Sequence, residues 1–475
     1  MFELRRGFAV AAAVAAGLFA PAGDSGADET CQSPYLPKIE GQEDFVYVWT
    51  LGIEGLGDGS DKLVTVGVNP QRDDYGKVIS SVSVGGRHEA HHAGFRDDRR
   101  QLWAGGLDDN LIFIFDVASD PAKPVLVRTI DDFAEKTGGV VGPHSFYALP
   151  GRMLISALSN AADRGGRTAL VEYNNEGKYI RTIWMPEGAE YGYDARVKAE
   201  LNRMLTSSFT GYTNYMRNLG ELMQDAEAMK NFGSTMVIWD YHARKPLQTL
   251  EVPGAPLEVR WALRPEHHYA FTTSALTGRL WGVFRKPDGS FEAVDLAPIG
   301  DPASPPLPVD ISLSADDRFL FVDSFLDGTV RVYDVSKPRE PKLVYEEKIG
   351  PQVNMVSQSW DGKRLYFTTS LLANWDGVGG EDAQFFKAYT WDGKKLAAGF
   401  ALDFRELALG RPHIMRLGQE DFYKGRVAAG RGGAASEARS EAQPSGGGPP
   451  QGPAAQRAAG ERSSGRGGGS APFAR

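Results

Sequence analysis

The sequence predicts an all-β fold, a seven-bladed β-propeller with a short helical insertion in one blade. Two observations support this prediction. A unit made of a β-branched and aromatic strand, an acidic turn and a second strand recurs through the middle of the chain. The unit recurs about every 35 to 50 residues, which is the spacing of propeller blades with about four strands each. The units fill residues 45–403 about seven times, and six or eight blades would also fit the spacing.

Each recurring unit places apolar residues at alternate positions of a short segment, which is the pattern of a β-strand. In chain order, the units begin at residues 112–117, 169–173, 236–240, 330–335 and 389–392. The strand before the unit recurs as well, at residues 101–103, 152–155, 316–321 and 361–366. We therefore expect these segments to be strands of successive blades.

One segment departs from the strand pattern. Residues 212–232 are expected to form a helix inserted in a blade, because apolar residues recur there at spacings of three and four. These residues are Met216, Leu219, Leu222, Met223, Ala226 and Met229. Thioethers are copper ligands, but we interpret this stripe as packing.

The N-terminus is expected to be an export signal. Arg5 and Arg6 precede an apolar run at residues 8–20, and residues 20–22 have the small-x-small form of a cleavage site. The run is shorter than the about 20 residues that span a bilayer, so we expect no stable membrane insertion. We predict a signal peptide at residues 1–22, which also resembles a twin-arginine signal, and a periplasmic protein.

The remaining domain boundaries follow from composition. We predict an N-terminal segment at residues 23–44, a propeller at 45–423 and a disordered tail at 424–475, which is built of Gly, Ala, Ser, Arg, Pro and Gln. The only cysteine, Cys31, cannot form a disulfide within the chain. The formal net charge of −9 argues against nucleic-acid binding.

Residues 87–92 contain three of the eight histidines of the chain. Neutral imidazole is a common ligand of copper, zinc and iron. The segment contains the letters of the zinc-protease motif H-E-x-x-H, which requires a helix. Gly85, Gly86 and Gly94 surround it, so we reject that interpretation.

Two further histidines, His144 and His413, each follow a proline in segments that we expect to be loops outside the blade strands. Together with His91 and His92 they would form an all-nitrogen site, which suits Cu(II) or zinc. Adjacent residues on a loop or strand point in different directions, so His91 and His92 can both reach one metal only if the backbone turns between them or the metal sits beside the loop.

Other histidines are assigned lesser roles. His88 and Glu89 are candidates for orienting a metal ligand from behind. His267 and His268 form a rival pair, which we place on a surface hairpin, and His242 is expected to be solvated.

Several segments resemble the selenium-binding protein family, whose bacterial members include copper-dependent methanethiol oxidases. They are residues 44–49, 62–66, 89–94, 256–260, 309–314 and 361–370. The resemblance covers nearly all of residues 31–423. It implies a propeller, a copper centre, and oxidation of methanethiol with oxygen and water to formaldehyde, hydrogen sulfide and hydrogen peroxide. It also implies that His91, His92, His144 and His413 are the copper ligands and catalytic residues.

The chain departs from the family at one position. Thr50 stands where animal members carry the cysteine that binds selenium, which argues against selenium binding here. The expected partners are therefore methanethiol and oxygen, and a homo-oligomer is compatible with the sequence. Two alternatives stay open: a non-catalytic propeller that binds a protein partner, and a protein that stores or transports copper or selenium.

Overall fold

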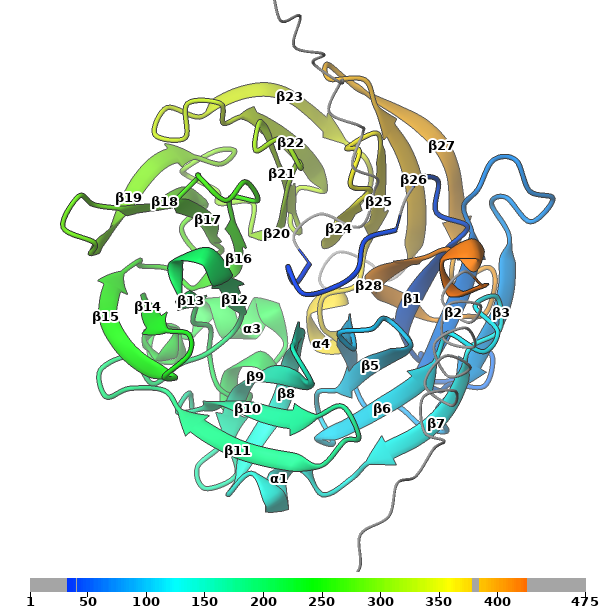
Figure 1. Cartoon of the computed structure of the whole chain (residues 1–475), viewed down its shortest axis with the longest axis horizontal. Coiled ribbons are helices and arrows are strands. Elements are labelled where there is room, and N and C mark those ends of the chain that lie inside the picture. Colours follow the sequence, from blue (N-terminus) through cyan, green and yellow to red (C-terminus); the bar gives the residue numbers. More distant parts are fainter. Residues whose placement is uncertain (1–31, 40, 378–383, 425–475) are drawn as a thin grey trace, which may run out of the picture. The chain divides into compact units, whose positions relative to one another are not determined.

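The computed structural model describes residues 32–39, 41–377 and 384–424. The predicted signal peptide and almost all of the predicted tail lie outside these residues. Within them, 28 strands form seven four-stranded antiparallel sheets, arranged as the blades of a ring (Figure 1). The predicted fold class, an all-β propeller with seven blades, is confirmed. No helix in these ranges has the length and apolar character needed to cross a membrane.

The strands of each blade run outward from the centre of the ring, in sequence order for six of the seven sheets. The second to fourth sheets contain β4 (Ala90–Phe95), β5 (Gln101–Gly106), β6 (Leu111–Asp116) and β7 (Val125–Ile130); β8 (Val140–Leu149), β9 (Arg152–Asn160), β10 (Ala169–Asn174) and β11 (Tyr179–Trp184); and β12 (Ala195–Lys198), β13 (Arg203–Thr206), β14 (Thr235–Asp240) and β15 (Lys245–Glu251).

The fifth to seventh sheets follow the same plan. They contain β16 (Pro256–Trp261), β17 (Tyr269–Ser274), β18 (Arg279–Arg285) and β19 (Phe291–Pro298); β20 (Pro308–Leu313), β21 (Phe319–Ser324), β22 (Thr329–Asp334) and β23 (Lys342–Lys348); and β24 (Met355–Gln358), β25 (Arg364–Thr368), β26 (Phe385–Trp391) and β27 (Leu396–Asp403).

The first sheet joins segments from opposite ends of the propeller. Its strands are β28 (Arg411–Gly418), β1 (Phe45–Leu51), β2 (Lys62–Gly67) and β3 (Val78–Ser83). The innermost strand β28 pairs with β1, so that Phe45 lies opposite Gly418 and Leu51 opposite Arg411. This pairing closes the ring and leaves no open edge between the first and last blades.

The core consists of the layers between neighbouring blades. Both faces of a blade pack against other blades, so an inner strand such as β1 is buried at every position, whereas the outermost strand β7 is largely exposed. Three indole rings, those of Trp49, Trp103 and Trp239, are among the largest fully buried side chains. The recurring segments of the sequence are strands of successive blades, as predicted, and they occupy the second, third and outermost positions.

The predicted insertion lies between β13 and β14, but the prediction of one helix is wrong. The structure has three short pieces, α2 (Tyr212–Tyr215), α3 (Leu219–Gln224) and the 3₁₀ helix η2 (Ala228–Asn231). The Asn218 side chain accepts hydrogen bonds from the first amides of α3, and Asp225 accepts them from Glu227 and Ala228. Asn218 thus caps the start of α3, whereas Asp225 holds the turn between α3 and η2. Met223 is exposed.

Two further helices are one turn long. They are α1 (Phe133–Lys136), which precedes β8, and α4 (Ala373–Asp376), which lies in the segment between β25 and β26. Figure 1 places α3 and α4 near the centre of the ring. The Asn374 side chain donates a hydrogen bond to the Met216 carbonyl, so the two inserted segments contact each other.

Candidate metal centre

The four predicted metal ligands all lie on innermost strands, at irregularities in strand pairing. On β4, Ala90 pairs with Gly106 and Ala93 pairs with Ala104. Two residues, 91–92, therefore face a single residue on β5, which is a β-bulge. Because a bulge breaks the strict alternation of a strand, both adjacent histidines can reach the centre of the ring. The requirement that the backbone turn between them is met in this way.

His144 and His413 lie at bulges of the same kind. Pro143 and Phe146 of β8 pair with residues two apart on β9, and β28 shows the same three-for-two step between Pro412 and Met415. The expectation that these histidines lie in loops outside the blade strands is wrong. The proline before each histidine is typical of a loop. Proline is also tolerated at a bulge on the edge strand of a sheet, where its missing N–H is not needed for pairing.

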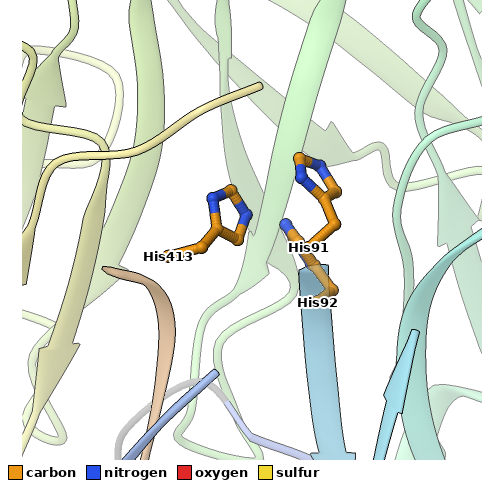
Figure 2. A group of neighbouring side chains, drawn as sticks. All are labelled: His91, His92 and His413. Carbon is orange, nitrogen blue, oxygen red and sulfur yellow. The ribbon is translucent and has the colours of Figure 1, made fainter. Parts of the chain in front are cut away.

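The four imidazoles pack against one another across the channel; we call them the histidine tetrad. Nε2 of His91 lies 3.1 Å from Nε2 of His144. The ring centroids of His91 and His413 are 4.1 Å apart, and those of His92 and His144 are 4.2 Å apart. One nitrogen from each of His91, His92 and His413 lies within 4.8 Å of the others, and Figure 2 shows His413 facing the pair on β4.

The outer nitrogens of two tetrad members bind the protein. Nδ1 of His413 lies 2.6 Å from the Ser370 carbonyl oxygen, and Nδ1 of His144 lies 3.0 Å from that of Tyr193. A carbonyl can only accept, so each Nδ1 carries the proton and each Nε2 keeps its lone pair. Backbone carbonyls of other blades thus set the tautomers of His144 and His413.

The tetrad is buried and neutral. Each of its side chains is at most 3% exposed. Burial lowers the pKa of His144 and of His413 to about 3. Burial, together with the neighbouring imidazoles, holds the pKa of His91 and of His92 well below the usual value. Unprotonated nitrogens are therefore available at neutral pH.

The donor set fits a transition metal. Within the described residues, Nε2 of His92 and Nε2 of His413 are buried without a hydrogen-bond partner, an arrangement that is costly unless something binds them. Nitrogens bound to one metal at about 2.0 Å are about 3 Å apart, close to the distance between His91 and His144. Four imidazoles and no thiolate suit Cu(II) or zinc.

A network of buried charges lies next to His92. Oε1 of Glu258 is 3.8 Å from Nε2 of His92, and the Glu258 carboxylate also pairs with Arg260 and Arg196 at 2.7 and 3.3 Å. Burial raises the pKa of Asp194, which pairs with the same two arginines. The network can hold charge and water close to the tetrad.

Sequence reasoning missed this network and the groups that hold the imidazoles. Glu258 and Asp310 each lie at a bulge on an innermost strand, two residues after a proline. A proline followed within two residues by a charged or imidazole side chain was the signal for an innermost strand, and it is shared with His144 and His413. No sequence pattern marks the carbonyl of Ser370.

The two residues predicted to orient a metal ligand, His88 and Glu89, bind other groups of the protein. Nδ1 of His88 is 2.7 Å from Oδ2 of Asp109, and among the described residues no contact joins its ring to the tetrad. Glu89 accepts a hydrogen bond from the amide of Ala373 at 2.8 Å, and burial raises its pKa to about 8. Glu89 therefore positions α4.

The other histidines stay apart from the tetrad. His267 pairs with Asp317 at 2.7 Å in the hairpin between β16 and β17, where its side chain is 33% exposed. His242 is exposed. In the described ranges, the three tetrad members His91, His92 and His413 form the one cluster of potential metal ligands.

Known proteins resemble this chain over most of its length. Residues 26–417 match the family model of the 56 kDa selenium binding protein. The chain is 58% identical over 411 residues to the methanethiol oxidase of Ruegeria pomeroyi, covering 84% of this chain and 94% of that protein. It is 57% identical over 395 residues to the methanethiol oxidase of a Hyphomicrobium species, covering 82% and 90%.

A solved structure shares the fold. It is a hypothetical selenium-binding protein from Sulfolobus tokodaii, with a TM-score of 0.71 and 24% sequence identity, covering 79% of this chain and 93% of that one.

Proposed function

The chain belongs to the 56 kDa selenium-binding protein family, and on that premise we propose that it is a copper-dependent methanethiol oxidase of the periplasm. In this reaction one molecule each of methanethiol, oxygen and water gives one each of formaldehyde, hydrogen sulfide and hydrogen peroxide. The carbon is oxidised by two electrons and oxygen accepts them. The names of the relatives at 57% and 58% identity support the activity. The observation that carries the assignment of the site is the convergence of four buried, neutral imidazoles from three strands.

The protein's own groups have defined roles in this proposal. His91, His92, His144 and His413 hold the metal, and copper bound there supplies affinity for a soft thiolate and one-electron redox chemistry. The carbonyls of Tyr193 and Ser370 keep two of the rings in the binding tautomer. The burial of the tetrad excludes bulk water from the reacting sulfur. Glu258 places a carboxylate beside His92, on one side of the channel.

The test combines metal analysis with turnover. We expect purified protein to contain copper and to consume oxygen when methanethiol is added. His144→Ala should lose copper and turnover together, because Nε2 of His144 faces His91 directly. His242→Ala removes an exposed histidine and is the matched control, with copper and turnover unchanged. Full copper occupancy and full turnover in His144→Ala would overturn the assignment of the site.

The same measurements separate the alternatives. Copper without oxygen consumption would identify a storage or transport protein, and protein without stoichiometric metal would identify a binding module. Selenium capture through a thiol has little support at Thr50, which is buried on β1 with its hydroxyl donating to the Val48 carbonyl.

Export is tested by fractionation of cells. We propose that residues 1–22 direct the protein to the periplasm. The double substitution Arg5→Lys and Arg6→Lys should retain the protein in the cytoplasm if the signal is of the twin-arginine type, and leave export intact if it is of the general type. Wild-type protein in the cytoplasm would contradict the localisation.

A further inference from the structure

The bulges that hold the histidine tetrad belong to a larger set around the channel. β16 and β20 have the same three-for-two step, at residues 257–258 and 309–310. The bulges on β4, β16 and β20 each present two consecutive side chains to the channel. The first residues of three bulges, which line one cavity, are His91, Leu257 and Val309. The second residues, which line another cavity, are His92, Glu258 and Asp310.

The tetrad therefore borders two cavities of opposite character. The one beside His92 is charged, with Glu258, Arg260 and Asp310 in its wall. The one beside His91 is lined almost wholly by apolar side chains. We call this second space the apolar cavity. A ligand with one apolar end and one polar end would place its apolar end in the apolar cavity. Covering the buried charges of the other cavity with an apolar group would cost their solvation.

The inserted segments cover the apolar cavity. Phe209 follows β13, Trp375 belongs to α4, and their ring centroids are 5.9 Å apart. Both line the cavity together with Leu371. The aromatic contact continues from Phe209 to Tyr193, at 5.4 Å, and from Tyr193 to the ring of His144, at 4.1 Å. The cover of the cavity is thus packed directly onto the tetrad.

The apolar cavity is small. Its volume is about 10 Å³. By the same measure, that is about the space needed for one water molecule or one small group. Its wall offers few polar atoms. Water there would find few partners, so the space suits a methyl-sized apolar group.

We propose that the apolar cavity binds the alkyl group of the thiol and that its size makes the methyl group the preferred one. The sulfur then lies toward His91, at the edge of the cavity that the tetrad forms. The proposal rests on the proposed oxidase function and adds to it the origin of substrate size selection. It assigns Leu371 and Phe209 as specificity-determining residues, although neither bears a reactive group.

Enlarging the cavity tests the proposal. Leu371→Ala and Phe209→Leu should raise the ratio of kcat/KM for ethanethiol to kcat/KM for methanethiol by about tenfold or more, since one methylene commonly decides that much in an apolar pocket. Leu320→Ala, a truncation in the layer between β17 and β21 that is equally buried and does not line the cavity, is the matched control and should leave the ratio unchanged.

A filling variant gives a readout that does not depend on turnover. Ala275→Val adds volume to the wall of the cavity and should weaken the binding of methanethiol to copper-loaded protein, measured by calorimetry without oxygen. The copper content should stay at the wild-type value, because Ala275 lines the cavity and is not one of the proposed metal ligands. This variant decides the question if the enlarged variants fail to fold.

The possible outcomes distinguish a failure of the proposed function from a failure of the size selection inferred for the apolar cavity. Wild-type protein that lacks copper or does not oxidise methanethiol would overturn both the proposed function and this inference. Wild-type activity with an unchanged ratio in folded, copper-loaded Leu371→Ala and Phe209→Leu, or with unchanged methanethiol binding in Ala275→Val, would overturn this inference alone.

Discussion

Nε2 of His91 lies 3.1 Å from Nε2 of His144, although the two residues are 53 positions apart in the chain and lie on different blades. Neither nitrogen can be displaced far, since His91 sits in a bulge and the other ring nitrogen of His144 is held by the Tyr193 carbonyl. The geometry of the histidine tetrad is therefore a property of how adjacent blades pack, and it can be tested at residues outside the tetrad.

The first prediction concerns the support of His413. Nδ2 of Asn354 donates to the Ser370 carbonyl that also accepts the proton of His413 Nδ1, and it lies 3.1 Å from that nitrogen. Asn354→Leu should weaken copper binding about 10- to 100-fold, as loss of such supporting contacts commonly does. Competition with a chelator measures this. Gln358→Leu, at the end of β24, the strand that Asn354 directly precedes, removes a side chain bound to Ser312 instead. It should retain wild-type affinity, and equal affinities of the two variants would contradict the prediction.

The second prediction concerns the buried charges. Glu258 is 1% exposed and pairs with Arg260 and Arg196. Glu258→Ala should lower the free energy of unfolding by about 3–5 kcal/mol, because it leaves buried guanidinium groups undercompensated. The exposed pair of Asp295 and Arg279 is the comparison, and Asp295→Ala should cost about 1 kcal/mol or less. Urea unfolding of both variants gives the two values, and a cost of Glu258→Ala no larger than that of Asp295→Ala would refute this.

The third prediction concerns the layers between blades. Ile114 of β6 is 2% exposed in the core between the second and third blades. Ile114→Ala should reduce the free energy of unfolding by about 2–5 kcal/mol, from lost burial and the cavity left behind. Val127 of β7 is 50% exposed, and Val127→Ala should change it by about 0.5 kcal/mol or less. Similar midpoints for the two variants in a denaturant titration would show that the layers do not carry the stability.

The fourth prediction concerns pH. Burial raises the pKa of Asp61 to about 6 from a usual value of 3.8, and its carboxylate accepts the amides of Gly52 and His88. The folded protein thus keeps this proton when the unfolded chain has lost it. The resulting stabilisation amounts to about 3 kcal/mol of unfolding free energy at most. It is complete below about pH 4 and disappears as the pH rises through 6.

Asp61→Asn replaces the titratable carboxyl group with a neutral amide. The substitution should flatten the dependence of the free energy of unfolding on pH between about 4 and 6. Unfolding by urea at intervals of pH measures it. Asp295→Asn, at the surface, should leave the slope as in the wild type. A wild-type slope in Asp61→Asn would show that the carboxyl group is ionised in the folded protein throughout this range.

The outer strands of the blades could be predicted because their local signals agree. Asp116, for example, ends β6, and its carboxylate accepts hydrogen bonds from the amides of Ala118 and Ser119, which form the turn to β7. Alternating apolar residues followed by an acidic turn residue therefore mark a strand and its end together. The count of seven blades followed from the spacing of such units.

The innermost strands could not be predicted in the same way. His144, Glu258 and His413 interrupt the apolar pattern of their strands, and the bulges shift the alternation by one residue. These features are typical of loops when the chain is inspected locally. Only the ring of blades shows that the polar side chains face a common channel. The prediction of a single inserted helix failed for a related reason, since the hydrogen bonds of the Asn218 and Asp225 side chains to nearby amides are local and outweigh a weak helical periodicity.

The strand that closes the ring, β28, also carries His413. A nascent chain emerging from the ribosome can assemble blades two to seven and bring His91, His92 and His144 near each other before this last strand is available. The fourth imidazole arrives only when β28 pairs with β1. Completion of the histidine tetrad and closure of the propeller are thus a single event, so that tight retention of a metal ion would report that synthesis has passed β28.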